Sequence, residues 1–95
     1  MLFAVSCIDK PDHGPVRAEN RPAHVAFLKA NSASVKAAGP YLSDDGEAMV
    51  GSLLIVEAES RAALQALLDQ DPYAHAGLFA AVEIRPWKWT IGAPA

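Results

Sequence analysis

The sequence predicts an α+β fold whose elements follow one another in the order β-α-β-β-α-β. Apolar runs rich in β-forming residues lie near both ends and in the middle of the chain. Two stretches between these runs carry apolar residues at helical spacing, and prolines and glycines separate the segments. This order corresponds to the ferredoxin-like arrangement, an antiparallel sheet with two helices on one face.

The first strand is expected at residues 2–8, which are apolar and contain β-forming side chains. Residues 10–15 hold two prolines and a glycine, which predict a loop. Apolar side chains then recur near helical spacing from about residue 16 to residue 37, and this predicts the first helix. Pro22 leaves two alternatives. Either the helix begins near Asn20 with the proline in its first turn, or one turn ends at the proline and another begins.

The pair Gly39-Pro40 is typical of a helix end, because glycine follows the last turn and proline cannot continue it. We therefore expect only a short strand at residues 41–42. The polar residues 43–46 predict a turn. Residues 49–58 are strongly apolar and predict the next strand.

Ser60 is a good N-cap for a second helix over residues 61–70, which carries one apolar stripe. Asp71 and the proline that follows it end that helix. The last strand is expected at residues 78–89. Residues 90–95 form a tail that we expect to be loosely held.

Both faces of the predicted sheet are apolar. Leu53 and Leu54 point to opposite sides of one strand, and Phe79 and Val82 are expected on opposite sides of the last. An antiparallel sheet with one face in water should instead alternate apolar and polar residues. Since two helices cover only one face, the sequence predicts a C2 homodimer packed sheet to sheet.

Length and charge exclude several classes of protein. The 95 residues correspond to one domain, 1–95. The net charge of −3 argues against a nucleic-acid partner, which needs a basic surface. No apolar stretch approaches the roughly 18 residues that cross a bilayer, so we expect no membrane partner. The N-terminal segment lacks the basic region of a signal peptide, so a cytoplasmic location is expected.

His24 is the first candidate for chemistry. It lies three residues after Arg21, so the two side chains share a helix face. His24 is either a half-buried histidine bonded to a backbone carbonyl or a base whose second nitrogen is held by a carboxylate. Asp71 is the natural candidate for that carboxylate. It also fits the N-cap of a short turn over residues 73–76, and both roles are compatible because a capping carboxylate has a second oxygen.

Further candidates for substrate binding each have a structural alternative. Arg21 either holds a substrate carboxylate or enolate or forms a surface ion pair. Tyr73 either donates a hydrogen bond into a pocket or packs with its ring. Ser52 either lines the pocket or bonds across the strands, and we do not assign it as a nucleophile. Trp87 and Trp89 resemble a substrate shelf, but packing at the dimer interface is favoured.

Other chemistry finds little support. His13, His24 and His75 have no metal-ligand spacing, and the glycines form no phosphate-binding motif. Cys7 is the single cysteine, which excludes an internal disulfide and fits a small apolar filler in a strand. His75 follows Tyr73 closely and stays a weak site candidate. We therefore expect no metal and no cofactor.

Four short motifs carry a resemblance to a known family. They are Arg21-Pro22-Ala23-His24, Ala38-Gly39-Pro40, Asp71-Pro72-Tyr73 and Arg85-Pro86-Trp87-Lys88. By these motifs the chain resembles the YCII-related, or YciI-like, family from residue 2 to residue 88. The resemblance implies a ferredoxin-like fold of the dimeric α/β-barrel type with a His–Asp site that matches His24 and Asp71. The loop at residues 10–15 is where relatives vary, and it can set the shape of the pocket.

The resemblance also favours a function. The leading hypothesis is a small cofactor-free enzyme, a lyase or isomerase, in which His24 removes a proton and Asp71 orients it. Its substrate would be a small organic acid, lactone or quinol-like molecule. One family branch is associated with dehydrochlorination of chlorinated hydroxyquinols, and muconolactone isomerases have a similar small dimeric fold. The alternative is a non-catalytic or regulatory module that binds a small metabolite. An oxygen-using monooxygenase is less favoured.

Overall fold

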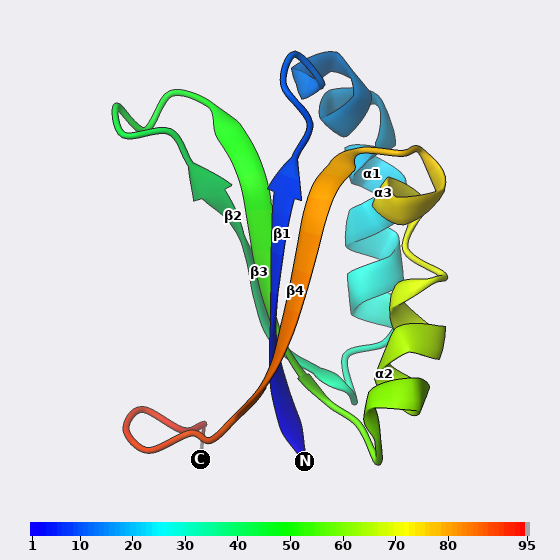
Figure 1. The fold of residues 1–95 in the computed structure, drawn as a ribbon, viewed down its shortest axis with the longest axis vertical. Coiled ribbons are helices and arrows are strands. Elements are labelled where there is room, and N and C mark those ends of the chain that lie inside the picture. The colour runs from blue at the N-terminus through cyan, green and yellow to red at the C-terminus, as the bar shows by residue number, and fades with distance from the viewer. Residues whose placement is uncertain (95) are drawn as a thin grey trace.

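A computed structural model describes residues 1–94 and has the predicted α+β fold (Figure 1). Four antiparallel strands form one sheet in the order β2-β3-β1-β4, which is compatible with the ferredoxin-like arrangement. All helices lie on one face of this sheet. The elements are β1 (Leu2–Asp9), α1 (Gly14–Ala30), β2 (Val35–Leu42), β3 (Met49–Glu57), α2 (Arg61–Leu68), α3 (Pro72–His75) and β4 (Phe79–Trp87). No helix in this part of the chain is long and apolar enough to cross a membrane.

The core lies between the sheet and the helices. Alternate residues of the central strand β1, among them Phe3 and Val5, point toward the helices and are buried. Val56 of β3 packs beside them, and Leu64 of α2 inserts from above the sheet with its side chain fully buried. Truncating Leu64 to alanine would leave a cavity and cost about 2–5 kcal/mol.

The first helix is shorter than predicted. Helix α1 ends at Ala30, where Asn31 donates its side-chain amide to the carbonyl of Phe27. The expected helix over residues 16–37 is wrong in its last part, because β2 begins at Val35 and pairs with β3. Pro40, expected to end the helix, lies in β2. It is tolerated there because β2 is an edge strand, where a missing N–H breaks no ladder.

The start of α1 also differs from both alternatives. The helix begins at Gly14 with Pro15 in its first turn, and Pro22 lies inside it without ending it. Asn20 is no cap. Its side chain instead donates to the carbonyl of Val16 one turn earlier. The loop predicted at residues 10–15 is therefore shorter in the structure, because residues 14 and 15 belong to the helix.

The connection from α2 to β4 follows the predicted caps. The hydroxyl of Ser60 accepts a hydrogen bond from the backbone N–H of Ala63, as expected of an N-cap. Asp71 caps the short helix α3 in the same way, through the N–H of Tyr73. Gly77 follows α3 with φ of 69°, a left-handed conformation that glycine adopts without strain.

Strand β4 contains an irregularity that moves Phe79. The register with β1 shifts between Ile8 and Asp9, so Phe79 pairs with Asp9 and packs against the core. The prediction that Phe79 faces away from Val82 is therefore wrong. Residues 88–94 form neither helix nor strand, and Ala95, the end of the predicted tail, lies outside the described residues.

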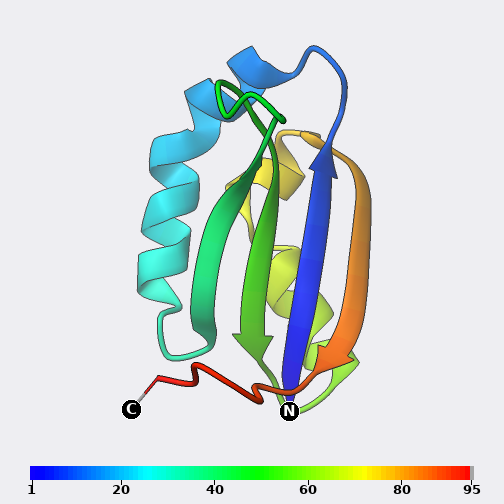
Figure 2. The ribbon, with the colours of Figure 1, turned by 90° about the vertical axis from the view of Figure 1, so that its left-hand side faces the viewer.

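Within residues 1–94, the second face of the sheet, which we call the open face, carries no helix (Figure 2). By strand register it presents Leu2, Ser6, Ile8, Tyr41, Leu53 and Trp87, among others. Ile8, Leu53 and Trp87 remain 48%, 37% and 39% exposed. This is the face that the dimer prediction assigns to a second copy of the chain, and that prediction stays open.

Gly51 has a defined packing role on the open face. A Cβ atom at this position would lie 2.4 Å from the carbonyl oxygen of Cys7 and 3.0 Å from a ring carbon of Tyr41. Its absence lets the Tyr41 ring lie across β3 and reach Ser6, whose hydroxyl is 2.9 Å from that of Tyr41. Position 51 therefore needs glycine for this close approach.

Candidate active site

A pocket of about 140 Å³ lies between α1, α3 and strands β2 and β3. This volume is close to that of the ~150 Å³ cavities that hold a benzene ring. Its polar wall consists of Arg17, Arg21, His24, Ser52 and Tyr73. The structure thus brings four predicted site residues, His24, Arg21, Ser52 and Tyr73, to one pocket, and adds Arg17.

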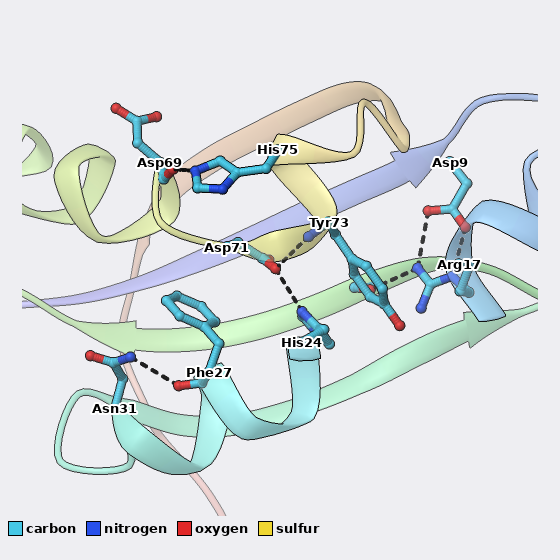
Figure 3. A network of polar contacts seen from close by, with 10 residues as sticks. Asp9, Arg17, His24, Phe27, Asn31, Asp69, Asp71, Tyr73 and His75 are labelled. Carbon is cyan, nitrogen blue, oxygen red and sulfur yellow. Dashed lines mark hydrogen bonds and ion pairs between the residues drawn. The ribbon is translucent and has the colours of Figure 1, made fainter. Parts of the chain in front are cut away.

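The predicted contact between His24 and Asp71 is present (Figure 3). Nδ1 of His24 lies 2.8 Å from Oδ1 of Asp71, within the range for a directly hydrogen-bonded pair. Both residues are buried, at 6% and 3% exposure. The same Oδ1 atom accepts the N–H of Tyr73, so one oxygen serves both the cap and the histidine. The expectation that the cap and the histidine use separate oxygens of Asp71 is therefore wrong.

The tautomer of His24 follows from this contact. An ionised carboxylate can only accept hydrogen bonds, so Nδ1 of His24 donates its proton to Asp71. In the neutral ring, Nε2 then carries the free lone pair. Every buried side-chain nitrogen or oxygen in the described part of the chain has a hydrogen-bond partner, and no bond to Nε2 is present there. Nε2 is therefore open to the pocket.

Tyr73 packs against the histidine with its ring. The two ring centroids are 3.8 Å apart with an interplanar angle of 13°. Phe79 contacts the Tyr73 ring edge-on at 6.1 Å. Burial raises the pKa of the Tyr73 phenol above its ordinary value, although nearby arginines oppose this, so the hydroxyl stays protonated and can donate. Both predicted roles of Tyr73, packing and donation, are compatible with this position.

Arg17 is the site residue that the sequence analysis missed. Its guanidinium is held on one side by Asp9, with Nε 2.7 Å from Oδ2 and Nη2 3.0 Å from Oδ1. Nη2 also donates to the hydroxyl of Ser52 at 2.9 Å. Figure 3 shows Tyr73 between His24 and Arg17, and the Arg17 Cζ atom lies 4.7 Å from the Tyr73 ring centroid.

The Arg17 group remains charged. Burial lowers the pKa of the guanidinium, but the hydrogen bond and charge of Asp9, with a contribution from Tyr73, outweigh it and raise the pKa overall. Two signals in the sequence point to this group. Arg17 precedes Arg21 by four residues and His24 by seven, which places all three on one helix face. Asp9 continues the alternation of the buried residues of β1.

The remaining candidates lie elsewhere. Arg21 lines the pocket but is exposed, and among residues 1–94 no ion pair joins it to an acidic side chain. His75 is exposed and its Nε2 lies 2.6 Å from the carbonyl oxygen of Asp69, outside the pocket (Figure 3). Trp87 and Trp89 contact each other edge-on at 5.2 Å, and neither lines the pocket.

The single thiol of the chain is not available for chemistry at the pocket. Cys7 is buried, and burial, with the charges of Asp71 and Asp9, raises its pKa to about 12. This fits the predicted filler role, because a thiol in that state is a poor nucleophile. Within residues 1–94, no three His, Cys, Asp or Glu side chains lie close enough to hold a metal ion.

Comparison with known proteins gives matches along nearly the whole chain. The family model of the YCII-related domain matches residues 1–88. The protein YciI of Escherichia coli and that of Shigella flexneri are each 38% identical over 95 residues, covering 93% of this chain and 97% of the relative.

Two solved structures extend the comparison. The 5-chloro-2-hydroxyhydroquinone dehydrochlorinase of Burkholderia phenoliruptrix, solved with 2,5-dihydroxybenzoquinone, is 39% identical with a TM-score of 0.85. The match covers 93% of this chain and 94% of the dehydrochlorinase. A protein of Agrobacterium tumefaciens is similar in fold alone, with 15% identity, a TM-score of 0.56, and coverage of 99% of this chain and 98% of that chain.

Proposed function

The chain belongs to the YCII-related domain family, and we propose that it is a small enzyme of the lyase or isomerase type. His24 acts as its general base. The observation that carries this proposal is the bond of 2.8 Å between Nδ1 of His24 and Asp71, together with the opening of Nε2 into the pocket. A buried imidazole that a carboxylate orients beside a ring-sized pocket is suited to remove a proton from a bound molecule.

Proton removal by His24 can lead to an elimination or to an isomerisation. Nε2 of His24 takes a proton from the substrate next to a carbonyl or enol, and the electrons of the broken bond form a new double bond. In an elimination a leaving group such as chloride departs with its electron pair, so the net loss is HCl. In an isomerisation the same proton returns to another atom. Asp71 stabilises the imidazolium that forms in between.

The proposed substrate is a small organic acid, lactone or quinol-like molecule. The relative that is 39% identical is a dehydrochlorinase of a chlorinated hydroxyhydroquinone, and this supports a small-molecule substrate for the present chain. The pocket of about 140 Å³ has room for one six-membered ring. Arg21, Ser52 and Tyr73 are proposed to bind the substrate, because each lines the pocket with a polar group.

The test is turnover of 5-chloro-2-hydroxyhydroquinone and of enol lactones, followed by chloride release and by absorbance. We expect His24→Ala to lower the rate by about 10²–10⁴-fold, the usual contribution of a general base. Asp71→Asn should lower it by a smaller factor. Asparagine caps a helix as well as aspartate does, so this variant removes the carboxylate and keeps the cap. His75→Ala is the matched control, since His75 lies outside the pocket.

Equal turnover by wild type and His24→Ala would contradict the proposal. If no substrate is turned over, a thermal-shift screen of the same molecules is the next experiment. It distinguishes a protein that binds these compounds without catalysis from one that does not bind them at all. Binding to the folded state raises the melting temperature. Binding without turnover, retained by His24→Ala, would favour the non-catalytic metabolite-binding or regulatory module.

We also propose that the protein forms a C2 homodimer through the open face. Apolar side chains of β1, β3 and β4 are partly exposed there, while the helices cover only the opposite face. Leu53→Lys should give monomers in analytical ultracentrifugation, because it places like charges across the two-fold axis. Val82→Lys is the matched control. Val82 is 47% exposed but lies on the helix side of β4. A wild-type monomer at all concentrations would overturn the dimer.

A further inference from the structure

Arg17 has hydrogen-bond donors that its bonds to Asp9 and Ser52 do not use. A guanidinium carries five N–H donors. Its bonds to Asp9 and Ser52 use three of them, one on Nε and two on Nη2. The two donors on Nη1 have no acceptor in these contacts, although Arg17 is only 5% exposed. Arg17 lines the same pocket as His24, and its guanidinium lies against the Tyr73 ring that stacks on His24.

Ser52 adds a donor at the same place. Its hydroxyl oxygen accepts the N–H of Arg17, so its own proton is free to be donated. Ser52 is 3% exposed and lines the pocket from β3, opposite the helix that carries Arg17 and His24. The Tyr73 side chain lies beside the same guanidinium, with its ring centroid 4.7 Å from Cζ of Arg17. Donors from two elements therefore converge on one end of the pocket.

We propose that Arg17 and Ser52 bind an anionic oxygen of the ligand, an enolate or phenolate, and hold it while His24 takes the proton. This deepens the proposed function and rests on it for the part played by His24. The charge that develops when a proton leaves next to a carbonyl or enol resides on oxygen. Donors fixed before the reaction stabilise such a charge most strongly in a site that excludes water.

Arg17 fits this role better than Arg21, to which the sequence analysis assigned it. Arg17 is buried and fixed by Asp9 through two parallel bonds, a geometry that fixes both position and plane. Arg21 is exposed at the rim of the same pocket, where water screens its charge. Asp9 is a positioning residue in this scheme. It fixes the guanidinium and leaves the Nη1 end free.

The experiment uses 4-nitrophenol as the probe, because its neutral and ionised forms differ in colour and it ionises near neutral pH. We expect the wild-type protein to bind phenolate over phenol by about tenfold, which lowers the apparent pKa of the bound probe by about 1. This absorbance titration reports on the ligand's charge and needs no turnover. A purely structural role of Arg17 would leave it unchanged.

The decisive variant is Asp9→Asn/Arg17→Gln. It removes both charges of the pair, so no buried aspartate is left unpaired and the chain is expected to fold. This variant should lose the preference for phenolate. Arg21→Gln should lose less of it, and Lys29→Gln, the same charge change on an exposed part of α1, should lose none. Ser52→Ala should weaken the preference about threefold, within the usual effect of one hydrogen bond.

Three outcomes would overturn the assignment. The first is an unchanged preference in the Asp9→Asn/Arg17→Gln protein, folded as judged by circular dichroism. The second is a preference that Arg21→Gln abolishes. The third is no binding of the probe to wild type at millimolar concentration. His24→Gln separates this inference from the proposed function, because it should abolish turnover and retain phenolate binding. If the wild-type protein binds phenolate but turns over no substrate, the anion site is supported and the proposal that the protein is an enzyme is wrong.

Discussion

The two faces of the sheet differ in the kind of side chain that they bury and in the kind that they expose. The helix-covered face buries charged and polar groups, among them Arg17, His24 and Asp71, and each has a partner within hydrogen-bonding distance. The open face leaves Ile8 and Leu53 partly in water, because every helix of the described part of the chain lies on the other face. A small domain therefore places its polar groups inside and part of its apolar surface outside.

The difference shows that the site and the sheet surface serve separate purposes. Burying a charge is costly unless it is paired and hydrogen-bonded, so the covered face retains its cluster only while every partner is present. The apolar residues of the open face need no specific partner of this kind. Burial of these residues by another surface is favourable by roughly 25 cal/mol per Å² of apolar area removed from water. Substitutions on the covered face should therefore act on folding and site together, and those on the open face on packing alone.

The largest effect is expected when one charge of the covered face is removed. Arg17→Gln leaves Asp9 buried without a partner and should lower the free energy of unfolding by about 3–5 kcal/mol. Asp9→Asn/Arg17→Gln should recover much of this loss. Urea denaturation of both proteins measures the difference. Equal losses in the single and double variants would show that pairing does not stabilise this face.

A second effect of similar or smaller size is expected from pH. The pKa of Cys7 is raised to about 12 from 9.0, so its ionisation is disfavoured in the folded state. The stabilisation that follows is complete below pH 9 and is lost as pH rises toward 12, by up to about 4 kcal/mol. Cys7→Ala removes this contribution and keeps that of Tyr73. The difference between the two stability profiles above pH 9 therefore isolates the thiol, and parallel profiles would contradict the prediction.

The smallest effect is expected on the open face. Gly51→Ala places a methyl group 2.4 Å from the carbonyl oxygen of Cys7 and should destabilise the chain by about 1–3 kcal/mol. The Tyr41 ring must move, but the contact between His24 and Asp71 should be retained. Thermal unfolding gives the first quantity, and the chemical shifts of the histidine ring give the second. A perturbed histidine would show that the two faces are coupled.

Local signals in the sequence were sufficient for strands β1, β3 and β4 and for the helix caps. Ser60 and Asp71 cap helices as residues of their type do, and alternation placed the buried residues of β1 and β3. The end of α1 was beyond these signals. Val35 and its neighbours continue a helical spacing, and only pairing with β3, a tertiary contact, makes them a strand.

The site shows the same limit. The sequence motifs predicted the contact of His24 with Asp71, and the structure has it. Arg17 was missed because an arginine on a helix is usually solvated, and its partners Asp9 and Ser52 come from strands β1 and β3. The shift of Phe79 depends on a bulge that leaves no mark in the residue pattern.

The short helix α3 gives the site a temperature dependence of its own. A helix of four residues is marginal by itself, and the Oδ1 atom of Asp71 that begins it is also the atom that holds His24. Warming frays such segments before the rest of a domain unfolds. When α3 frays, the imidazole loses its orientation while the sheet is still intact. Any activity of His24 should therefore decline at a lower temperature than the sheet melts.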